Sequence, residues 1–157
     1  MKEDSKLYNA AFDPYRSAGY MTNWAARLFA RVMDKRLKPF GMSSGQMPVF
    51  FALSARPALS QKQLAEAAAT EQPTMAATLA RMQRDGLLVK RPNPRDGRSA
   101  LYSLSPEALE KSREIRAAAE EINAAALAGL NEDERAAYLA MMAKVVGTLD
   151  ARLADGD

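Results

Sequence analysis

Hydrogen-bonding side chains recur along one face of a helix that the sequence predicts between residues 71 and 85. Three apolar residues of this stretch, Met75, Leu79 and Met82, stand at i, i+4 and i+7 and would turn one stripe toward a core. The other face would carry Gln72, Thr74, Thr78 and Arg81. Amide, hydroxyl and guanidinium groups form hydrogen bonds with base edges in the major groove of DNA. A helix with this face is therefore suited to reading a duplex.

Cationic side chains gather in the segment that follows this helix. Residues 88–91 and 100–104 predict two short strands. The residues between them break regular structure and predict a hairpin with a long tip: Pro92, Asn93, Pro94 and Gly97. The hairpin carries one acid, Asp96, against four cations: Lys90, Arg91, Arg95 and Arg98. Such a tip can contact phosphates or enter the minor groove.

The charge of the chain is concentrated in this region. The whole chain has a formal net charge of only +3 and a pI of about 9.3, which by itself barely argues for nucleic acid. Residues 81–98, however, hold six cationic side chains and two carboxylates, a surplus of four. A local surplus larger than that of the whole chain is typical of an electrostatic footprint for a polyanion.

Cysteine and histidine are both absent. Their absence removes disulfides, thiolate nucleophiles, the commonest zinc ligands and the usual general base near neutral pH. No spacing of Asp and Glu suggests a metal site, and no glycine-rich phosphate loop is present. We therefore expect no catalytic residues, no metal and no cofactor, and a protein that is not an enzyme.

At 157 residues the chain has the length of one domain with a sizeable core. Its N-terminal stretch is too polar for a signal peptide, and no apolar run is long enough to cross a bilayer. The expected location is the cytoplasm.

Start and stop signals divide the rest of the chain into helices. Ser60 and Gln63 form a predicted capping box, Ser105 precedes a proline at the first helical position, and Asn131 begins a second capping box. Residues 1–16 are expected to form a loose arm with a short helical turn, and residues 56–59 a connector. The predicted helices cover 17–38, 43 or 44 to 55, 60–68, 71–85, 105–128 and 131–153.

The N-terminal and C-terminal helices differ in composition. Two apolar rows run along residues 17–38, and we expect Trp24 and the other aromatic residues there to pack in a core, with a small-molecule pocket as the alternative. The two C-terminal helices are rich in alanine and poor in large apolar residues. Such a pair predicts a second subunit that packs against these helices and the N-terminal helix, and the alternative is an intramolecular bundle.

This order of helices, helix–turn–helix, two-stranded wing and two long helices resembles the MarR/SlyA family of winged helix-turn-helix transcriptional regulators. The resemblance covers residues 17–153 and is sharpest at 71–75, at 79–87 and at 92–98, where Asp96 and Arg98 look like the family's wing signature. It implies a mainly α fold with an α+β wing. Residues 43–105 would form the DNA-binding lobe, with the helix–turn–helix at 60–85 and the wing at 88–104. Residues 17–38 and 106–153 would form a helical dimerisation region.

The resemblance also implies how DNA would be bound. Two subunits would present reading heads about 34 Å apart to an inverted-repeat operator. Four residues of each head would meet base edges: Gln72, Pro73, Thr74 and Thr78. Phosphates would be held by Ser60, Gln61, Lys62 and Arg81. Arg98 or Arg95 would enter the minor groove or follow its backbone, with Asp96 orienting Arg98; the alternative is that Asp96 and Arg98 only stabilise the loop.

Relatives in this family commonly respond to small aromatic or amphipathic anions, which implies an effector site between the helices and the winged-helix lobe. Its lining here would be Tyr20, Trp24, Leu28, Met47 and Phe51, with Arg27 or Arg31 as the counter-charge. Oxidant sensing through cysteine cannot operate in this chain. The resemblance thus implies a ligand-responsive regulator, with repression as its action. The alternative is a winged helix used for nonspecific DNA binding or for protein contacts.

Overall fold

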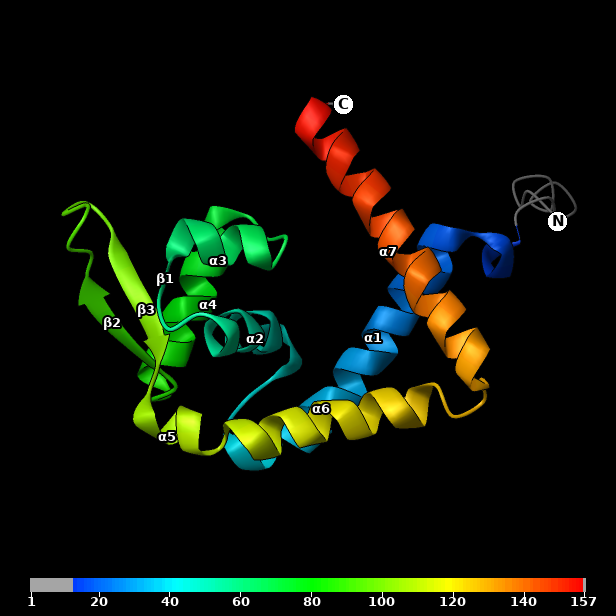
Figure 1. Ribbon diagram of the computed structural model, residues 1–157, viewed down its shortest axis with the longest axis horizontal. Coiled ribbons are helices and arrows are strands. Elements are labelled where there is room, and N and C mark those ends of the chain that lie inside the picture. Colours follow the sequence, from blue (N-terminus) through cyan, green and yellow to red (C-terminus); the bar gives the residue numbers. More distant parts are fainter. Residues whose placement is uncertain (1–12, 157) are drawn as a thin grey trace, which may run out of the picture. The chain divides into compact units, whose positions relative to one another are not determined.

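The computed structural model describes residues 13–156. Most of the expected N-terminal arm lies outside them, and its expected helical turn is the 3-10 helix η2 (Pro14–Arg16), capped by Asp13. The longer helices are α1 (Ala18–Leu37), α2 (Met47–Ala55), α3 (Gln61–Ala67), α4 (Gln72–Arg84), α5 (Pro106–Glu110), α6 (Ser112–Ala126) and α7 (Glu132–Asp155). The strands are β1 (Leu59–Ser60), β2 (Leu88–Pro92) and β3 (Ala100–Leu104) (Figure 1).

The helices begin where the capping residues predict. The hydroxyl of Ser17 accepts a hydrogen bond from the backbone N–H of Tyr20 at the start of α1. Ser105 accepts one from the N–H of Ala108 at the start of α5. Both predicted capping boxes, at Ser60 and Asn131, are present. Each of these side chains satisfies a backbone donor that the first helical turn leaves unpaired.

The helix expected from Ser43 or Ser44 begins as a 3-10 turn, η4 (Ser44–Gln46), and continues as α2. Ser43 and Gln46 form a further capping box at its start. Pro48 lies in the first turn of α2, where its missing N–H leaves no helical hydrogen bond unmade.

The predicted wing is confirmed, and it belongs to a three-stranded antiparallel sheet of order β1-β3-β2. Leu88 lies opposite Leu104 and Pro92 opposite Ala100, so β2 and β3 pair over their full length. β1 pairs with β3 through Leu59 opposite Tyr102. The expectation that residue 59 belongs only to a connector is therefore wrong. A strand of two residues has no alternating pattern by which a sequence could reveal it.

The core lies between this sheet and the helices α2, α3 and α4. Phe50, Leu64 and Met82 are fully buried there, and Met75 and Leu79 complete the stripe predicted for α4. Leu37 from the end of α1 and Ile115 from α6 join the same cluster. The core thus fixes α3 and α4 against each other and against the base of the wing.

The single helix expected over 105–128 is two helices. The chain breaks at Lys111, whose N–H points at the carbonyls of both Glu107 and Leu109, so α5 closes with a tighter turn than the α-helical ladder. Leu109 of α5 is 53% exposed, whereas Ile115 and Ile122 of α6 are buried. Neither glycine nor proline stands at the break, so the sequence carries no signal for it.

The aromatic residues of α1 do not enter the core. Leu37 is the only buried residue of this helix. Trp24 is half-buried and its ring lies 5.7 Å from that of Tyr15 and 5.8 Å from that of Tyr20. The expectation of core packing for Trp24 is therefore wrong: the two apolar rows of α1 cover more of the helix than the core of this chain buries.

By its contacts the chain divides at Ala119 into two units, of which the second starts at Glu120 and consists of the end of α6 and all of α7. In this second unit the Nε of Arg135 donates to the carbonyls of Leu127 and Leu130, which holds the turn between the two helices. None of the described residues of α7 is buried. No helix in the described part of the chain is long and apolar enough to span a membrane.

Candidate nucleic-acid interface

The N-terminal turn of α4 presents three of the four side chains predicted to meet bases. Gln72, Pro73 and Thr74 are exposed there, immediately before Met75, the first residue of α4 to enter the core. Pro73 occupies the first turn without loss of a hydrogen bond, as predicted.

Thr78 does not lie on this exposed face, and the expectation that it does is wrong. Thr78 is 8% exposed, and its hydroxyl donates a hydrogen bond to the carbonyl oxygen of Thr74 at 3.0 Å. The reason is angular: at 100° per residue Thr78 lies about 40° from Met82 around the helix axis, at the edge of the apolar stripe instead of opposite it.

The surface of α4 opposite the core contains exposed residues that were not among the predicted contacts. Ala77, Ala80 and Arg84 are exposed together with Arg81. The buried residues of α4 stand at positions 75, 78, 79 and 82, and at 100° per residue these four exposed residues lie on the opposite side of the helix. The helical period of the apolar residues could therefore have predicted their exposure from the sequence. The Nε of Arg84 lies 3.0 Å from the carboxylate of Asp85, an exposed pair that leaves the guanidinium open to solvent.

The residues at the start of α3 have separate tasks. The hydroxyl of Ser60 accepts from the N–H of Gln63, and the N–H of Ser60 donates to the Oε1 of Gln63, so Ser60 is engaged in its cap. Lys62 is exposed and lies 4.0 Å from Glu66, a contact at the outer limit of an ion pair. The amide of Gln61 instead reaches α4, where it hydrogen bonds with Gln72.

The tip of the wing is ordered by short-range hydrogen bonds. Asn93 donates from Nδ2 to the hydroxyl of Ser99 at 2.9 Å and accepts at Oδ1 from the N–H of Arg95 at 3.0 Å. Two backbone hydrogen bonds, from Asp96 to Asn93 and from Ser99 to Asp96, close the loop. The sequence indicated Asn93 as a breaker and as part of the segment that resembles the wing signature, but it gave no role to the side chain of Asn93 or to Ser99.

Asp96 acts on Arg98 through the backbone. Its Oδ1 accepts from the N–H of Arg98 at 3.0 Å, and within residues 13–156 no ion pair joins the carboxylate to the guanidinium. The Asp96 side chain therefore shapes the loop and leaves the charge of Arg98 unneutralised by a direct partner.

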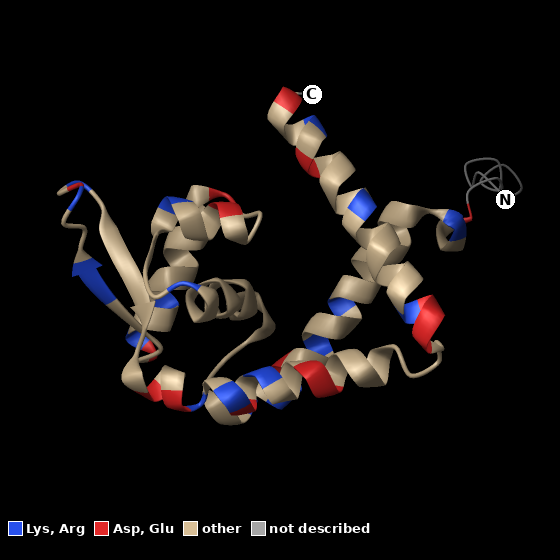
Figure 2. Cartoon of the chain, in the orientation of Figure 1, with Lys and Arg blue, Asp and Glu red and all other residues tan. Residues whose placement is uncertain are grey.

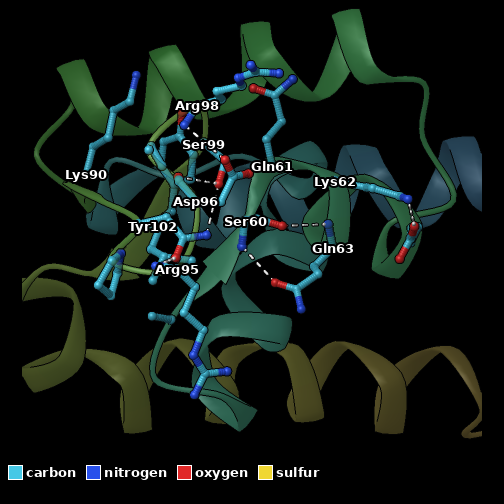
Figure 3. Close-up of a pocket in the computed structure, with 17 residues that line it drawn as sticks. Ser60, Gln61, Lys62, Gln63, Lys90, Arg95, Asp96, Arg98, Ser99 and Tyr102 are labelled. Carbon is cyan, nitrogen blue, oxygen red and sulfur yellow. Dashed lines mark hydrogen bonds and ion pairs between the residues drawn. The ribbon is translucent and has the colours of Figure 1, made fainter.

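A hollow of about 1190 Å³ lies between the start of α3 and the wing (Figure 3). Its lining includes Lys62, Lys90, Arg95 and Arg98 against the acids Glu66 and Asp96. In the view of Figure 3, Gln61, Lys90 and Arg98 extend to the same side of the hollow, whereas Arg95 extends to the opposite side. Figure 2 shows cationic residues on β2 and at the tip of the wing.

The cations of the wing are available to an anionic partner. Lys90 lies over the ring of Tyr102, with its Nζ 5.8 Å from the ring centroid, and no ion pair among the described residues engages Lys90, Arg95 or Arg98. Across residues 13–156 no group of His, Cys, Asp and Glu is placed to hold a metal ion.

The residues expected to line an effector site occupy different environments. Met47 is buried in the core, and Phe51, about one helical turn further along α2, is exposed. Trp24 is half-buried on α1, and four further residues of that helix are exposed: Tyr20, Arg27, Leu28 and Arg31.

Comparison with known proteins matches residues 40–99, which cover the helix–turn–helix and most of the wing, to the family model described as MarR family. The chain is 29% identical over 119 residues to YwoH of Bacillus subtilis (strain 168), named an uncharacterized HTH-type transcriptional regulator. That likeness covers 76% of this chain and 86% of YwoH.

Two solved structures have the same fold over most of their length. A probable transcriptional regulator from Pseudomonas aeruginosa is 27% identical with a TM-score of 0.78, over 85% of this chain and 99% of that one. The PcaV transcriptional regulator from Streptomyces coelicolor, solved in complex with its natural ligand, is 28% identical with a TM-score of 0.76, over 88% of this chain and 97% of PcaV. Family and fold are those of transcriptional regulators and not of enzymes. Residues 40–99 thus form a winged helix-turn-helix that matches the MarR family model, and the chain has the fold of transcriptional regulators.

Proposed function

We propose that this protein is a ligand-responsive repressor that binds an inverted-repeat operator as a homodimer. The observation that carries the proposal is the exposed N-terminal turn of α4 beside a wing whose cations have no ion-pair partner among the described residues. A helix end of this kind can enter the major groove, while the wing holds the backbone or the minor groove beside it.

Base edges would be met by Gln72, Pro73 and Thr74, which are exposed at the start of α4. Ala77 lies on the exposed side of the next turn, where its methyl group could pack on a thymine methyl. Lys62, Arg81 and Arg98 would neutralise phosphates or, for Arg98, enter the minor groove. Thr78 has no part in this contact because its hydroxyl is bonded within the helix.

The proposal of a homodimer is supported by the large apolar side chains that α7 leaves in solvent. Five of them are 44 to 76% exposed: Leu139, Val145, Val146, Leu149 and Leu153. A helix with such a stripe and no buried residue in its described part requires another surface to cover it. A second copy of the chain would supply that surface and place two reading heads on one duplex.

The proposal of an effector is supported by PcaV, which was solved with its natural ligand. In this chain an aromatic or amphipathic anion would contact the exposed and half-buried apolar residues of α1 and α2, which are Tyr20, Trp24, Leu28 and Phe51, with Arg27 or Arg31 as its counter-charge. Binding there would release the operator by favouring a dimer geometry that no longer fits two successive major grooves.

The test is selection of bound duplexes from a random pool, followed by affinity measurements on the winner at two salt concentrations. Recovery of an inverted repeat bound by one dimer is the expected result. Enrichment of no sequence, with weak and steeply salt-dependent binding, would refute the operator and favour a nonspecific DNA-binding or protein-binding winged helix.

A further inference from the structure

The first residues of α3 and α4 are joined by their side chains. The Nε2 of Gln61 donates to the Oε1 of Gln72 at 3.0 Å, and it also lies 3.4 Å from the backbone carbonyl oxygen of Gln72. Gln61 begins α3 and Gln72 begins α4, so the contact spans the helix–turn–helix at the end that carries the exposed reading residues.

The two contacts together fix which end of each amide faces the other. A backbone carbonyl can only accept a hydrogen bond, so the Gln61 atom beside it must be the nitrogen. A nitrogen in that position donates, and the Gln72 atom that it meets must therefore be the oxygen. The backbone carbonyl of Gln72 thus determines which atom of each side-chain amide is the oxygen and which is the nitrogen.

This orientation determines which hydrogen-bonding groups of Gln72 remain free to contact a base. Its Oε1 is engaged by Gln61, whereas its Nε2 carries two N–H donors that bond to no other described residue. The residue is exposed at the end of α4 that would enter the groove. Guanine presents two acceptors in the major groove, N7 and O6, whereas adenine presents one acceptor and one donor. The bidentate contact of a glutamine with adenine also needs the amide oxygen turned to the base.

We propose that Gln61 is a positioning residue for base readout: it holds the amide of Gln72 with its donors outward, so that this position prefers guanine. The proposal rests on the proposed function, because it requires a specific duplex. It gives Gln61 a different task from the phosphate contact that its place at the start of α3 suggests. Holding the side chain in one rotamer before binding also lowers the ordering cost at the interface.

The deciding experiment compares Gln61→Met, Gln72→Met and the control Lys62→Met on the selected operator and its single-base variants. Methionine keeps a long, unbranched side chain and removes the amide. In the unaltered protein we expect a preference for guanine of about tenfold at one base pair in each half-site. Gln61→Met and Gln72→Met should each reduce that preference to about twofold, and the double variant should lose no more than either single one. Lys62→Met should weaken binding to all sequences equally.

Gln61→Glu provides a second test, in which the base preference should change instead of being lost. A carboxylate can only accept, so Gln72 would have to turn its nitrogen toward residue 61 and its oxygen toward the base. The preference should then move from guanine to a base with a donor in the groove, adenine or cytosine. Thermal unfolding of each variant shows that the fold is kept.

Three outcomes separate the possibilities. If Gln61→Met weakens binding equally for every sequence, Gln61 is a phosphate contact and the positioning role is refuted, although the operator remains. If Gln61→Glu keeps the preference for guanine, the positioning role is likewise refuted. If the unaltered protein prefers no sequence at all, the proposed function itself fails.

Discussion

Thr74 and Thr78 stand one helical turn apart, and only Thr74 is available to DNA. The hydroxyl of Thr78 is bonded to the carbonyl of Thr74 and the residue is almost fully buried. Residue type gave both threonines the same expected role, because both can hydrogen bond with bases. Their difference comes from position relative to the apolar stripe.

Substituting each threonine by valine should separate these two positions. Thr74→Val should relax the preference at particular base pairs, at a cost of about 1–3 kcal/mol in binding free energy. Thr78→Val removes one helix-internal hydrogen bond and keeps the branched shape, so it should change unfolding free energy by about 1 kcal/mol or less. Base preference, measured on operator variants, should be unchanged by Thr78→Val. A specific loss at one base pair for Thr78→Val would show that α4 is rotated on binding.

Arg98 is expected to contribute charge and little sequence preference. Its guanidinium has no ion-pair partner among the described residues, and its backbone is held by Asp96. Arg98→Ala should weaken binding to all duplexes and lower the slope of log affinity against log salt by about 0.9. The matched control is Arg56→Ala, which removes an exposed arginine that does not line the hollow beside the wing. An unchanged salt slope for Arg98→Ala would contradict its contact with DNA.

At the scale of elements, the tip of the wing depends on Asn93. Its side chain joins Ser99 on one side and the N–H of Arg95 on the other, and the residue is half-buried. Asn93→Ala should therefore loosen the tip without disturbing the core, since each lost hydrogen bond is worth about 0.5–1.5 kcal/mol. We expect faster amide hydrogen exchange at residues 95–99, weaker DNA binding and a small fall in the unfolding midpoint. Protection equal to that of the unaltered protein would mean that the backbone hydrogen bonds alone hold the loop.

The short helix α5 carries an ion pair that makes a pH-dependent contribution. The Nζ of Lys111 lies 2.6 Å from Glu107, and this hydrogen bond, followed by the opposite charge, lowers the pKa of Glu107 and raises the pKa of Lys111. Because the pKa of Glu107 is lowered in the folded state, the pair stabilises the fold fully at pH values above the unfolded-state pKa of 4.5. That stabilisation is lost as the pH falls through the folded-state pKa. The raised pKa of Lys111 has its full effect below 10.5 and loses it as pH rises through the folded-state pKa.

Glu107→Gln should accordingly lower the unfolding free energy slightly at neutral pH and by less at acid pH, because the effect is lost as the pH falls through the lowered folded-state pKa of Glu107. Both groups are exposed, so the difference should be small and should shrink with added salt. Denaturant unfolding of the two proteins at both pH values measures it. The same difference at both pH values would assign it to helix propensity instead of charge.

The elements also show which parts of the fold a sequence can reveal. Ser60, Ser105 and Asn131 predicted helix starts because a cap is a local interaction between residues three apart. β1 exists only through its pairing with β3, so nothing within Leu59 and Ser60 announces it. The contact between Gln61 and Gln72 likewise depends on how α3 packs against α4, which no pattern within either helix specifies.

For the whole molecule, the composition of the C-terminal helices already indicated a second subunit. The structure supports that inference with the exposed stripe of α7 and the exposed apolar residues of α1, Tyr20, Met21, Leu28 and Val32. Fully burying one large apolar side chain contributes about 1.5–3 kcal/mol. Covering several of them can therefore offset the loss of rotational and translational freedom on association.

A charge in the stripe of α7 should separate the subunits. Leu149→Glu places a carboxylate at an exposed leucine between Val145 and Leu153, where a partner would have to desolvate it. The control is Ala151→Glu, an exposed position on the opposite side of the same helix at 100° per residue. Light scattering after size exclusion should give the dimer mass for the control and the monomer mass for Leu149→Glu.

Each winged helix folds around its own core, so the monomer of Leu149→Glu should still bind one half-site weakly. It should lose the gain in affinity that binding two half-sites at once gives the dimer. If Leu149→Glu remained dimeric with full affinity for the inverted repeat, the pairing surface would lie elsewhere, and the spacing of the reading heads would have to be derived from that other contact.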